Sequence, residues 1–312
     1  MGIFLVTLKQ FLEKLLDEDQ AVEPSSLSQL SGLSPSDIGL VSTIWEKYGT
    51  NRRVDLLTSM VGMAEEDVEL NFTTVLKLAL RDDASDVRRT AILGLWECEE
   101  RSLLSILIDL IQKDPSEEVR VAVALGLRKF VDLAESNKLL PNDSNRLREC
   151  LMNVINSPTE SLNVQRRAIE ALSPFSDGFI KELIQWAYQH ENPEMRESAV
   201  YAMGYNADPD WIPIITREFS NSNPAMRYEA VCASGRMGQE IVIPQLVALL
   251  KDDDLQVRLS TITALGSIGG PSAKRVLDNC LNLEDESVVD AAQAALEVTE
   301  AYEDPLSFEY KV

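Results

Sequence analysis

Apolar residues recur along this chain at helical spacing, and the helical pattern itself repeats. The stretches NPEMRESAVYAMG (192–204) and NPAMRYEAVCASG (223–235) are identical at eight of thirteen positions and start 31 residues apart. Each has a large apolar residue at a first position and apolar or small residues four, seven and eight positions later, which share one stripe of a helix. This first position recurs at Val87, Val119, Val164, Met195, Met226, Val257 and Val288.

The spacing of these first positions predicts a repeat protein. Successive intervals are 32, 45, 31, 31, 31 and 31 residues, and a weaker copy starts at Leu56. A second apolar helix follows a short turn in each unit, so a unit is a helix hairpin that cannot bury its apolar faces alone. We therefore predict an all-α protein, an α-solenoid (superhelix) of stacked antiparallel hairpins. The clearest second helices are 102–114, 179–190, 241–253 and 272–285.

Segments that break the period divide the chain. The expected solenoid covers residues 51–298, with one degenerate and seven clear repeats. About 14 extra residues near 130–147 predict a lengthened helix or a loop. The other expected segments are an amphipathic helix (1–16), an acidic Ser-rich linker (17–32), a capping helix that starts after Pro35 (33–50) and a C-terminal tail (299–312).

The repeat unit resembles a known family. The pattern D-x-x-x-x-V-R-x-x-A-x-x-A-L-G, as in DDDLQVRLSTITALG (252–266), is similar to HEAT repeats of the short bacterial type, such as those of bilin-lyase-like proteins. The resemblance covers roughly residues 51–298, in units shorter than the ~40–47 residues usual for HEAT repeats. It implies the solenoid fold and leaves the function open, because solenoids serve many tasks.

Charge narrows the range of partners. Lys and Arg number 29 against 51 Asp and Glu, which gives a formal net charge of −22. Nucleic-acid binding needs clustered Lys and Arg, so we expect none. The same sign disfavours anionic membrane surfaces, and no apolar run is long enough to predict a membrane span. The favoured partner is a protein with a basic surface.

No catalytic or metal-binding set is complete in the sequence. No G-x-S-x-G, Walker A or GxGxxG motif occurs, and adjacent acidic residues read as solvated turns. The cysteines lie far apart, which favours free thiols in a reducing compartment, and the chain start does not resemble a secretory leader. We expect a cytoplasmic, non-enzymatic protein without cofactor or metal. The cysteines are Cys98, Cys150, Cys232 and Cys280.

In five repeats an arginine follows the first position, six residues after a polar residue. The series fits either an anion-binding track or a ladder of hydrogen bonds between neighbouring hairpins, as the resemblance to HEAT repeats implies. We favour the ladder, because a planar guanidinium can donate two hydrogen bonds to one carboxylate. The predicted ladder residues are Asp82 and Arg88, Asp114 and Arg120, His190 and Arg196, Asn221 and Arg227, and Asp252 and Arg258.

His190 is the only histidine of the chain and precedes Glu191, which raises the question of a metal site. Deoxyhypusine hydroxylase, also a HEAT-repeat protein, holds two irons with repeated His-Glu pairs. That chemistry needs several imidazole and carboxylate ligands from different repeats, and one histidine cannot supply them. In QHENPEMR (189–196) His190 stands where other repeats have Asp or Asn. We therefore predict that it hydrogen-bonds the turn.

Residues of the second helices that the core does not use are candidates for binding. We expect the second helices to line the concave side. The column five residues before the ladder position varies between repeats, which suits a specific surface, although drift gives the same pattern. Trp186, beside this column, is either an exposed interface residue or, as we expect, a packed one. The candidates are Lys77, Asp109, Gln185, Trp186, Thr216 and Asp278.

The first 16 residues carry an apolar helical face opposite a polar one. We expect this helix to dock on its own solenoid or to mediate self-association; a partner's groove and a membrane are the alternatives. Taken together, the sequence predicts a non-enzymatic scaffold or adaptor. The alternative is an accessory or catalytic subunit of a bilin-lyase-type enzyme, or another HEAT-repeat enzyme. The apolar face is formed by Phe4, Leu5, Leu8, Phe11, Leu12, Leu15 and Leu16.

Overall fold

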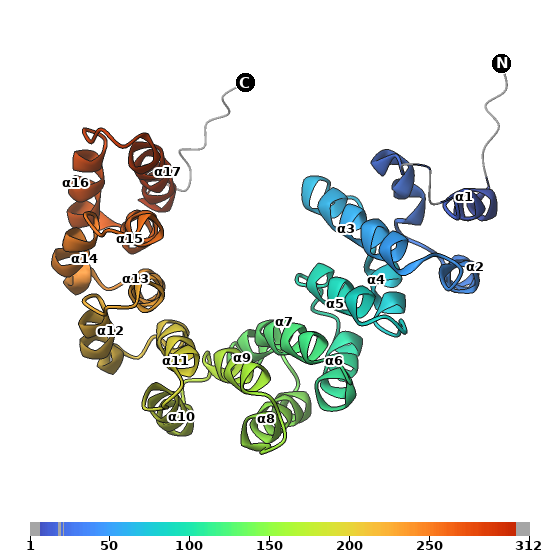
Figure 1. Cartoon of the computed structure of the whole chain (residues 1–312), viewed down its shortest axis with the longest axis horizontal. Helices are drawn as coiled ribbons and strands as arrows, with labels where there is room; N and C mark the ends of the chain where they lie inside the picture. Colours follow the sequence, from blue (N-terminus) through green and yellow to red (C-terminus); the bar gives the residue numbers. More distant parts are fainter. Residues whose placement is uncertain (1–6, 18–19, 21, 304–312) are drawn as a thin grey trace. The chain divides into compact units, whose positions relative to one another are not determined.

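A computed structural model of the chain describes residues 7–17, 20 and 22–303, and the described part is helical without any strand. The prediction of an all-α solenoid is therefore confirmed: helix hairpins follow one another along the chain (Figure 1). The chain divides into two compact units. The first comprises Met1–Leu133 and Leu139–Val164, and the second comprises Ala134–Lys138 and Gln165–Val312.

The first unit contains the N-terminal helices and the first repeats. Its elements are α1 (Leu8–Lys14), η1 (Pro24–Leu30), α2 (Pro35–Trp45), α3 (Thr50–Glu66), α4 (Thr73–Ala79), α5 (Ser85–Gly94), α6 (Arg101–Lys113), most of α7 (Glu117–Glu135) and α8 (Pro141–Asn156).

The second unit contains the repeats with the most regular period. Its elements are most of α9 (Leu162–Leu172), α10 (Gly178–Tyr188), α11 (Pro193–Asn206), η2 (Pro209–Trp211), α12 (Ile212–Glu218), α13 (Pro224–Met237), η3 (Glu240–Val242), α14 (Ile243–Leu249), α15 (Leu255–Ile268), α16 (Gly270–Cys280) and α17 (Glu286–Glu303).

Local sequence explains where the first helices begin. Asn192 and Asn223 precede α11 and α13, and their side-chain oxygens accept backbone N–H groups of the first helical turn. Each is followed by a proline, whose fixed φ and missing N–H suit the first position of a helix. Asp254 caps α15 in the same way, without a proline. The repeated caps therefore set the same starting point in successive hairpins.

The first helices of the second unit approach one another at backbone distance. A Cβ placed on Gly204 of α11 would lie 2.7 Å from the Cα of Ala233 on α13. One placed on Gly235 would lie 2.9 Å from the Cα of Ala264 on α15, and Gly266 repeats the contact with α17. No real Cβ fits at such distances, so glycine at this repeated position allows the first helices to pack closely.

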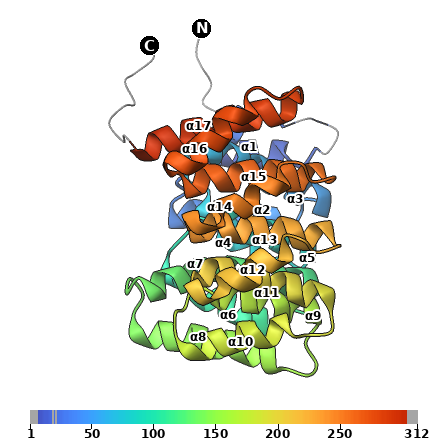
Figure 2. The ribbon, with the colours of Figure 1, turned by 90° about the vertical axis from the view of Figure 1, so that its left-hand side faces the viewer.

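This close packing sets the direction in which the second unit curves. Helices α11, α13, α15 and α17 lie on the inner side of its curve, and α10, α12, α14 and α16 lie on the outer side (Figure 1). Figure 2 looks onto these outer helices, stacked one above the other. The expectation that second helices line the concave side is therefore wrong in this unit. The stack is shortest along its glycine-bearing first helices, so it bends toward them.

The N-terminal elements pack on the first repeats. In α1, Phe11 and Leu12 are buried, and the Tyr48 hydroxyl donates to the carbonyl of Leu12 at 2.8 Å. The capping helix α2 is joined to the solenoid by the buried Trp45, whose Nε1 donates to Asp82 at 2.8 Å. The described part of the amphipathic helix thus docks on its own chain. Phe4 and Leu5 of the predicted apolar face lie outside the described residues.

The structure corrects the expected linker and the expected start of the C-terminal tail, and it shows what the insertion forms. The linker assignment is wrong for Pro24–Leu30, which forms η1 because Leu27 and Leu30, three residues apart, share one face and are buried. The tail does not start at 299, since α17 continues to Glu303. The inserted residues lengthen α7 and α8, which are joined by a short turn. Asp143, at the start of α8, is buried and pairs with Arg101.

Candidate protein-binding surfaces

In the first unit, arginines join neighbouring hairpins through carboxylates. Arg88 donates from Nε and Nη2 to both oxygens of Asp114, at 2.7 and 2.8 Å, and also from Nη1 to the carbonyl of Asp82 at 2.8 Å. Arg120 reaches Glu160 with the same two-point geometry, at 3.0 and 2.9 Å. Each guanidinium therefore closes its own turn and holds the next hairpin.

Two residues of this series do not occur in the predicted set. Arg53 pairs with Asp82 at 2.7 Å, although it stands in the degenerate first repeat. Glu160 replaces aspartate after the insertion, which shifts the period. Neither residue fits the six-residue spacing of the regular repeats. For Glu160 the available signal was an acidic residue next to the expected slot, and for Arg53 it was an arginine near the weak first position Leu56.

The second unit repeats the geometry with an interruption. Arg227 donates to both oxygens of Asp252 at 2.7 Å, and hydrogen bonds from Arg227 hold the pKa of Asp252 below its usual range. Arg258 lies 3.5 Å from Asp285. Arg196 donates to the carbonyls of His190 and Glu191 at 2.9 and 2.8 Å. The next slot holds the neutral Asn221, so the ladder has no carboxylate there.

His190 makes the same hydrogen bond as the aspartate found at its position in another repeat. Its Nδ1 accepts the backbone N–H of Asn192 at 3.0 Å, just as Oδ1 of Asp252 accepts that of Asp254 at 2.9 Å. The ring also lies edge-on to Trp186, with centroids 5.5 Å apart. The side chain of His190 thus acts within the turn between two hairpins.

Gln185 and Trp186 come together in a groove on the outer side of the second unit. The groove has a volume of about 480 Å³ between α10 and α12. The Trp186 side chain is 49% exposed, so the expectation that it packs in the core is wrong. The groove is lined by Lys181, Glu182, Gln185, Trp186, Gln189, Asp210, Trp211 and Ile214.

The rim of this groove is acidic on balance. Lys181 lies 2.6 Å from Asp208 and 2.7 Å from Asp210, and the hydrogen bond from Lys181 lowers the pKa of Asp208. Glu182 adds a further exposed carboxylate. The single cation of the rim is therefore neutralised, and the apolar floor has an anionic border.

The other predicted binding residues do not gather with these two. Lys77 is mostly buried and pairs with Glu100 at 2.5 Å, which lowers the pKa of that carboxyl. Asp109 pairs with Lys113 on the same helix, and the Thr216 hydroxyl donates to the carbonyl of Ile212 within α12. Asp278 is exposed on α16. These four lie in separate places on the second helices.

The inner side of the second unit carries a cluster that the sequence analysis missed. The Arg236 guanidinium lies 4.5 and 4.6 Å from the ring centres of Tyr201 and Tyr205, and 3.3 Å from Glu229. Burial raises the pKa of Glu229. Tyr201 and Tyr205 stand six and ten residues after Met195. The two tyrosines lie four residues apart and so share one face of α11, which was the available signal, but the candidate binding residues were predicted on the second helices alone.

Neither a cluster of metal-ligating side chains nor a helix suited to spanning a bilayer occurs in the described part of the chain. No three His, Cys, Asp or Glu side chains gather there in a way that could hold a metal ion. The described helices include none with the length and apolarity needed to cross a bilayer. The four cysteines are free thiols, with Cys150 and Cys280 buried and Cys98 and Cys232 half-buried.

Comparison with known proteins identifies the repeat. The model described as HEAT repeats matches residues 73–142, 180–258 and 235–297, more than half of the chain. Among curated proteins no match is found. The matched stretches include the repeats from which the resemblance was first drawn.

Solved structures show the same fold at low identity. Yeast importin-beta (Kap95p) is 14% identical with a TM-score of 0.52, over 96% of this chain and 45% of that chain. The YibA protein of Escherichia coli is 20% identical with a TM-score of 0.45, over 89% and 98%. Human deoxyhypusine hydroxylase is 16% identical with a TM-score of 0.38, over 94% and 97%. At these identities the likeness extends to the solenoid fold alone.

Proposed function

Because the chain belongs to the HEAT-repeat family, we propose that it is a non-enzymatic scaffold or adaptor that binds a protein partner with a basic surface. The fold supplies a rigid frame of stacked hairpins, and side chains that the frame does not use are free to recognise a partner. The proposal extends to location in the cytoplasm, in keeping with free thiols and an acidic, helical chain.

The half-exposed Trp186 in the outer groove is the observation that carries this proposal. Tryptophan is among the residues that most often dominate the energy of a protein interface, above all within a pocket that excludes water. Here its ring shares a groove with Trp211 and Ile214. A solvated surface gains nothing from leaving this ring exposed, whereas a partner's apolar side chain would bury it.

The charge of the chain defines the partner. The buried Arg53 and Arg88 and the half-buried Arg227 are used inside the ladder, where each faces a carboxylate. The excess of acidic side chains therefore faces solvent. Complementary charge on a partner speeds encounter and selects against acidic competitors.

A matched pair of variants tests the groove. Trp186→Ala removes the exposed ring, and Phe179→Ala removes an equally exposed ring, 49%, on the same helix but outside the groove. Immobilised protein is used to capture partners from lysate, which are quantified by mass spectrometry. We expect Trp186→Ala to lose a stoichiometric partner about tenfold or more, while Phe179→Ala retains it. Equal capture by both variants would refute the role of the groove.

A further inference from the structure

A small pocket with both apolar and polar side chains in its lining opens in the first unit, where α3, α4 and α5 meet. Its volume is about 280 Å³. It lies between two loops, one after α3 and one after α5, and its floor includes Gly94, where an added Cβ would lie 2.4 Å from Val61. The apolar lining is Met60, Val61, Val68, Leu70, Phe72, Leu76, Leu95 and Trp96.

Two large apolar side chains at the mouth of the pocket face solvent. Val68 is 95% exposed and Trp96 is 57% exposed, and they come from the two different loops. Single exposed apolar residues are common on protein surfaces, whereas two that flank one pocket form a continuous apolar surface of the kind found at interaction sites.

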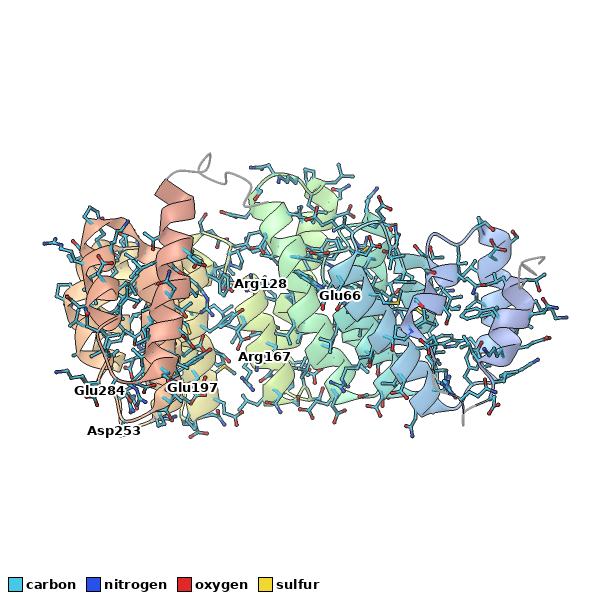
Figure 3. All side chains as sticks on the ribbon, turned by 90° about the horizontal axis from the view of Figure 1, so that it is seen from above. Glu66, Arg128, Arg167, Glu197, Asp253 and Glu284 are labelled. Carbon is cyan, nitrogen blue, oxygen red and sulfur yellow. The ribbon has the colours of Figure 1, made fainter. Side chains whose placement is uncertain are left out.

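The same two loops carry an excess of negative charge. Glu65, Glu66 and Asp67 end α3 and begin its loop, Glu69 follows, and Glu97 comes directly after Trp96. All five are exposed, and none forms an ion pair with a residue that the structure describes. Figure 3 labels Glu66 at the end of α3. The pocket therefore combines a cluster of apolar side chains with the polar Asn71, Thr73 and Cys98, and its mouth is anionic.

Hydrogen bonds from a lysine of α7 hold the loop that carries Trp96. The half-buried Lys129 donates from Nζ to the carbonyls of Leu95 and Trp96, the latter at 3.1 Å, and burial lowers the pKa of this lysine to about 8. Lys77 donates to Glu100 at 2.5 Å and to Ser102 at 3.1 Å. Lys129 thus bonds the backbone of the loop, and Lys77 bonds residues that follow the loop. These bonds hold the pocket in shape, and neither lysine neutralises the five carboxylates around the mouth.

Size decides what kind of ligand fits. Pockets for small molecules and cofactors commonly hold about 300–1,000 Å³ and enclose most of the ligand. A pocket of 280 Å³ with an open mouth suits one large side chain. Charge then decides what surrounds that side chain, since Lys or Arg on either side would meet the glutamates of the rim.

We propose that this pocket, bounded by Val68 and Trp96 and ringed by Glu65 and Glu97, docks a basic segment of a partner protein through one large aliphatic or aromatic side chain. This rests on the proposed scaffold function and adds to it a recognition rule: an apolar residue flanked by Lys or Arg. Residues of the first unit form this pocket, whereas residues of the second unit form the groove at Trp186.

The direct test uses the full chain and a fluorescein-labelled lysine-rich peptide with one central leucine. Fluorescence anisotropy measures its affinity, alongside a peptide with serine in place of the leucine and one with glutamates in place of the lysines. We expect the serine peptide to bind about tenfold more weakly, as loss of one buried leucine predicts, and the glutamate peptide not to bind. Equal affinity for the leucine and serine peptides would overturn the proposal.

Matched variants locate the binding. Trp96→Ser and Glu97→Lys should each weaken binding of the leucine peptide about tenfold. Their controls in the second unit are Ile241→Ser, an apolar side chain 69% exposed, and Glu284→Lys, an exposed loop carboxylate labelled in Figure 3; these should bind normally. Circular dichroism shows whether each variant is folded. If folded Trp96→Ser and Glu97→Lys bind like the controls, the pocket is not the site.

Two other possible occupants of the pocket, a second copy of the chain and the chain's own start, are tested by light scattering and by truncation. If light scattering shows a dimer that Trp96→Ser converts to a monomer, a second copy fills the pocket and the proposal is wrong. If removal of residues 1–6 strengthens peptide binding severalfold, the chain's own start fills it, and the proposal is again wrong. Failure of peptide binding with intact Trp186-dependent capture would overturn this pocket alone, whereas loss of all capture by the unmodified chain would overturn the scaffold function.

Discussion

At the scale of single residues, His190 shows how far position within a repeat determines chemistry. Its place in the aspartate slot could be predicted from the period, because the neighbouring repeats supply the comparison. The sequence could not predict which ring nitrogen accepts the N–H of Asn192, because an imidazole has two nitrogens. The geometry of the turn selects Nδ1. The lone histidine thus accepts the turn N–H that a carboxylate accepts in another repeat.

That equivalence gives a prediction. His190→Asp supplies another acceptor for the N–H of Asn192, so the free energy of unfolding should change little. His190→Ala leaves this N–H without its partner and should cost about 1 kcal/mol, the usual value of a lost cap. Urea titration followed by circular dichroism measures both. An aspartate variant as unstable as the alanine variant would show that the ring does something a carboxylate cannot.

Arg227 tests the ladder itself. Its partner Asp252 is 6% exposed in the side chain, so Arg227→Ala leaves a nearly buried carboxylate unpaired. We expect a loss of about 2–4 kcal/mol in the free energy of unfolding. Arg275→Ala serves as control, since the side chain of Arg275 is exposed and only bonds a carbonyl of its own helix. If binding of a partner falls while stability is unchanged, the arginines serve recognition instead.

The same pair predicts a dependence on pH. Hydrogen bonds from Arg227 hold the pKa of Asp252 below its ordinary value of ~3.9 in the folded state. Its stabilisation is therefore complete above that value and is lost as pH falls through the lower, folded pKa. The stability difference between the unmodified chain and Arg227→Ala should be constant from neutral pH to about pH 5 and shrink below about pH 4. A difference independent of pH in acid would contradict the pairing.

At the scale of elements, the hairpins could be predicted but the direction of curvature could not. Period and stripe fix which residues face the core, as with Met195, Ala199 and Met226, all nearly inaccessible. Curvature depends on how far apart successive first helices lie compared with successive second helices. Gly204 and Gly235 signal a close approach, but the sequence does not give the spacing on the other side.

Glycines at close and open positions should respond oppositely to alanine. Gly235→Ala places a methyl group against the backbone of Ala264 and should destabilise by about 1–3 kcal/mol. Gly62→Ala lies in α3 with nothing within 4 Å of the added methyl, and should stabilise by about 0.5–1 kcal/mol through helix propensity. Thermal denaturation of both variants checks the signs. A harmless Gly235→Ala would mean that the helices can move apart freely.

At the scale of the whole molecule, the stacking of the hairpins determines which charged and exposed apolar side chains lie next to one another. The binding column predicted from sequence contained Gln185 and lay beside Trp186, but the groove they share also needs Trp211 and Ile214 from the next hairpin. Sequence variation alone could not separate these two residues from Lys77 or Thr216, which are engaged in local contacts. If the proposed function is right, recognition depends on which variable residues the stacking of hairpins brings together.

Calorimetric titration of the captured partner into the purified full chain, at low and at physiological salt, tests the central claim most directly. An acidic scaffold with an apolar groove should form a stoichiometric complex whose affinity falls as salt rises, because the steering charges are screened, but does not vanish, because the groove contact is apolar. The Trp186→Ala chain should bind at least tenfold more weakly at both salt concentrations. A partner that binds equally well to that variant at every salt concentration would contradict the account.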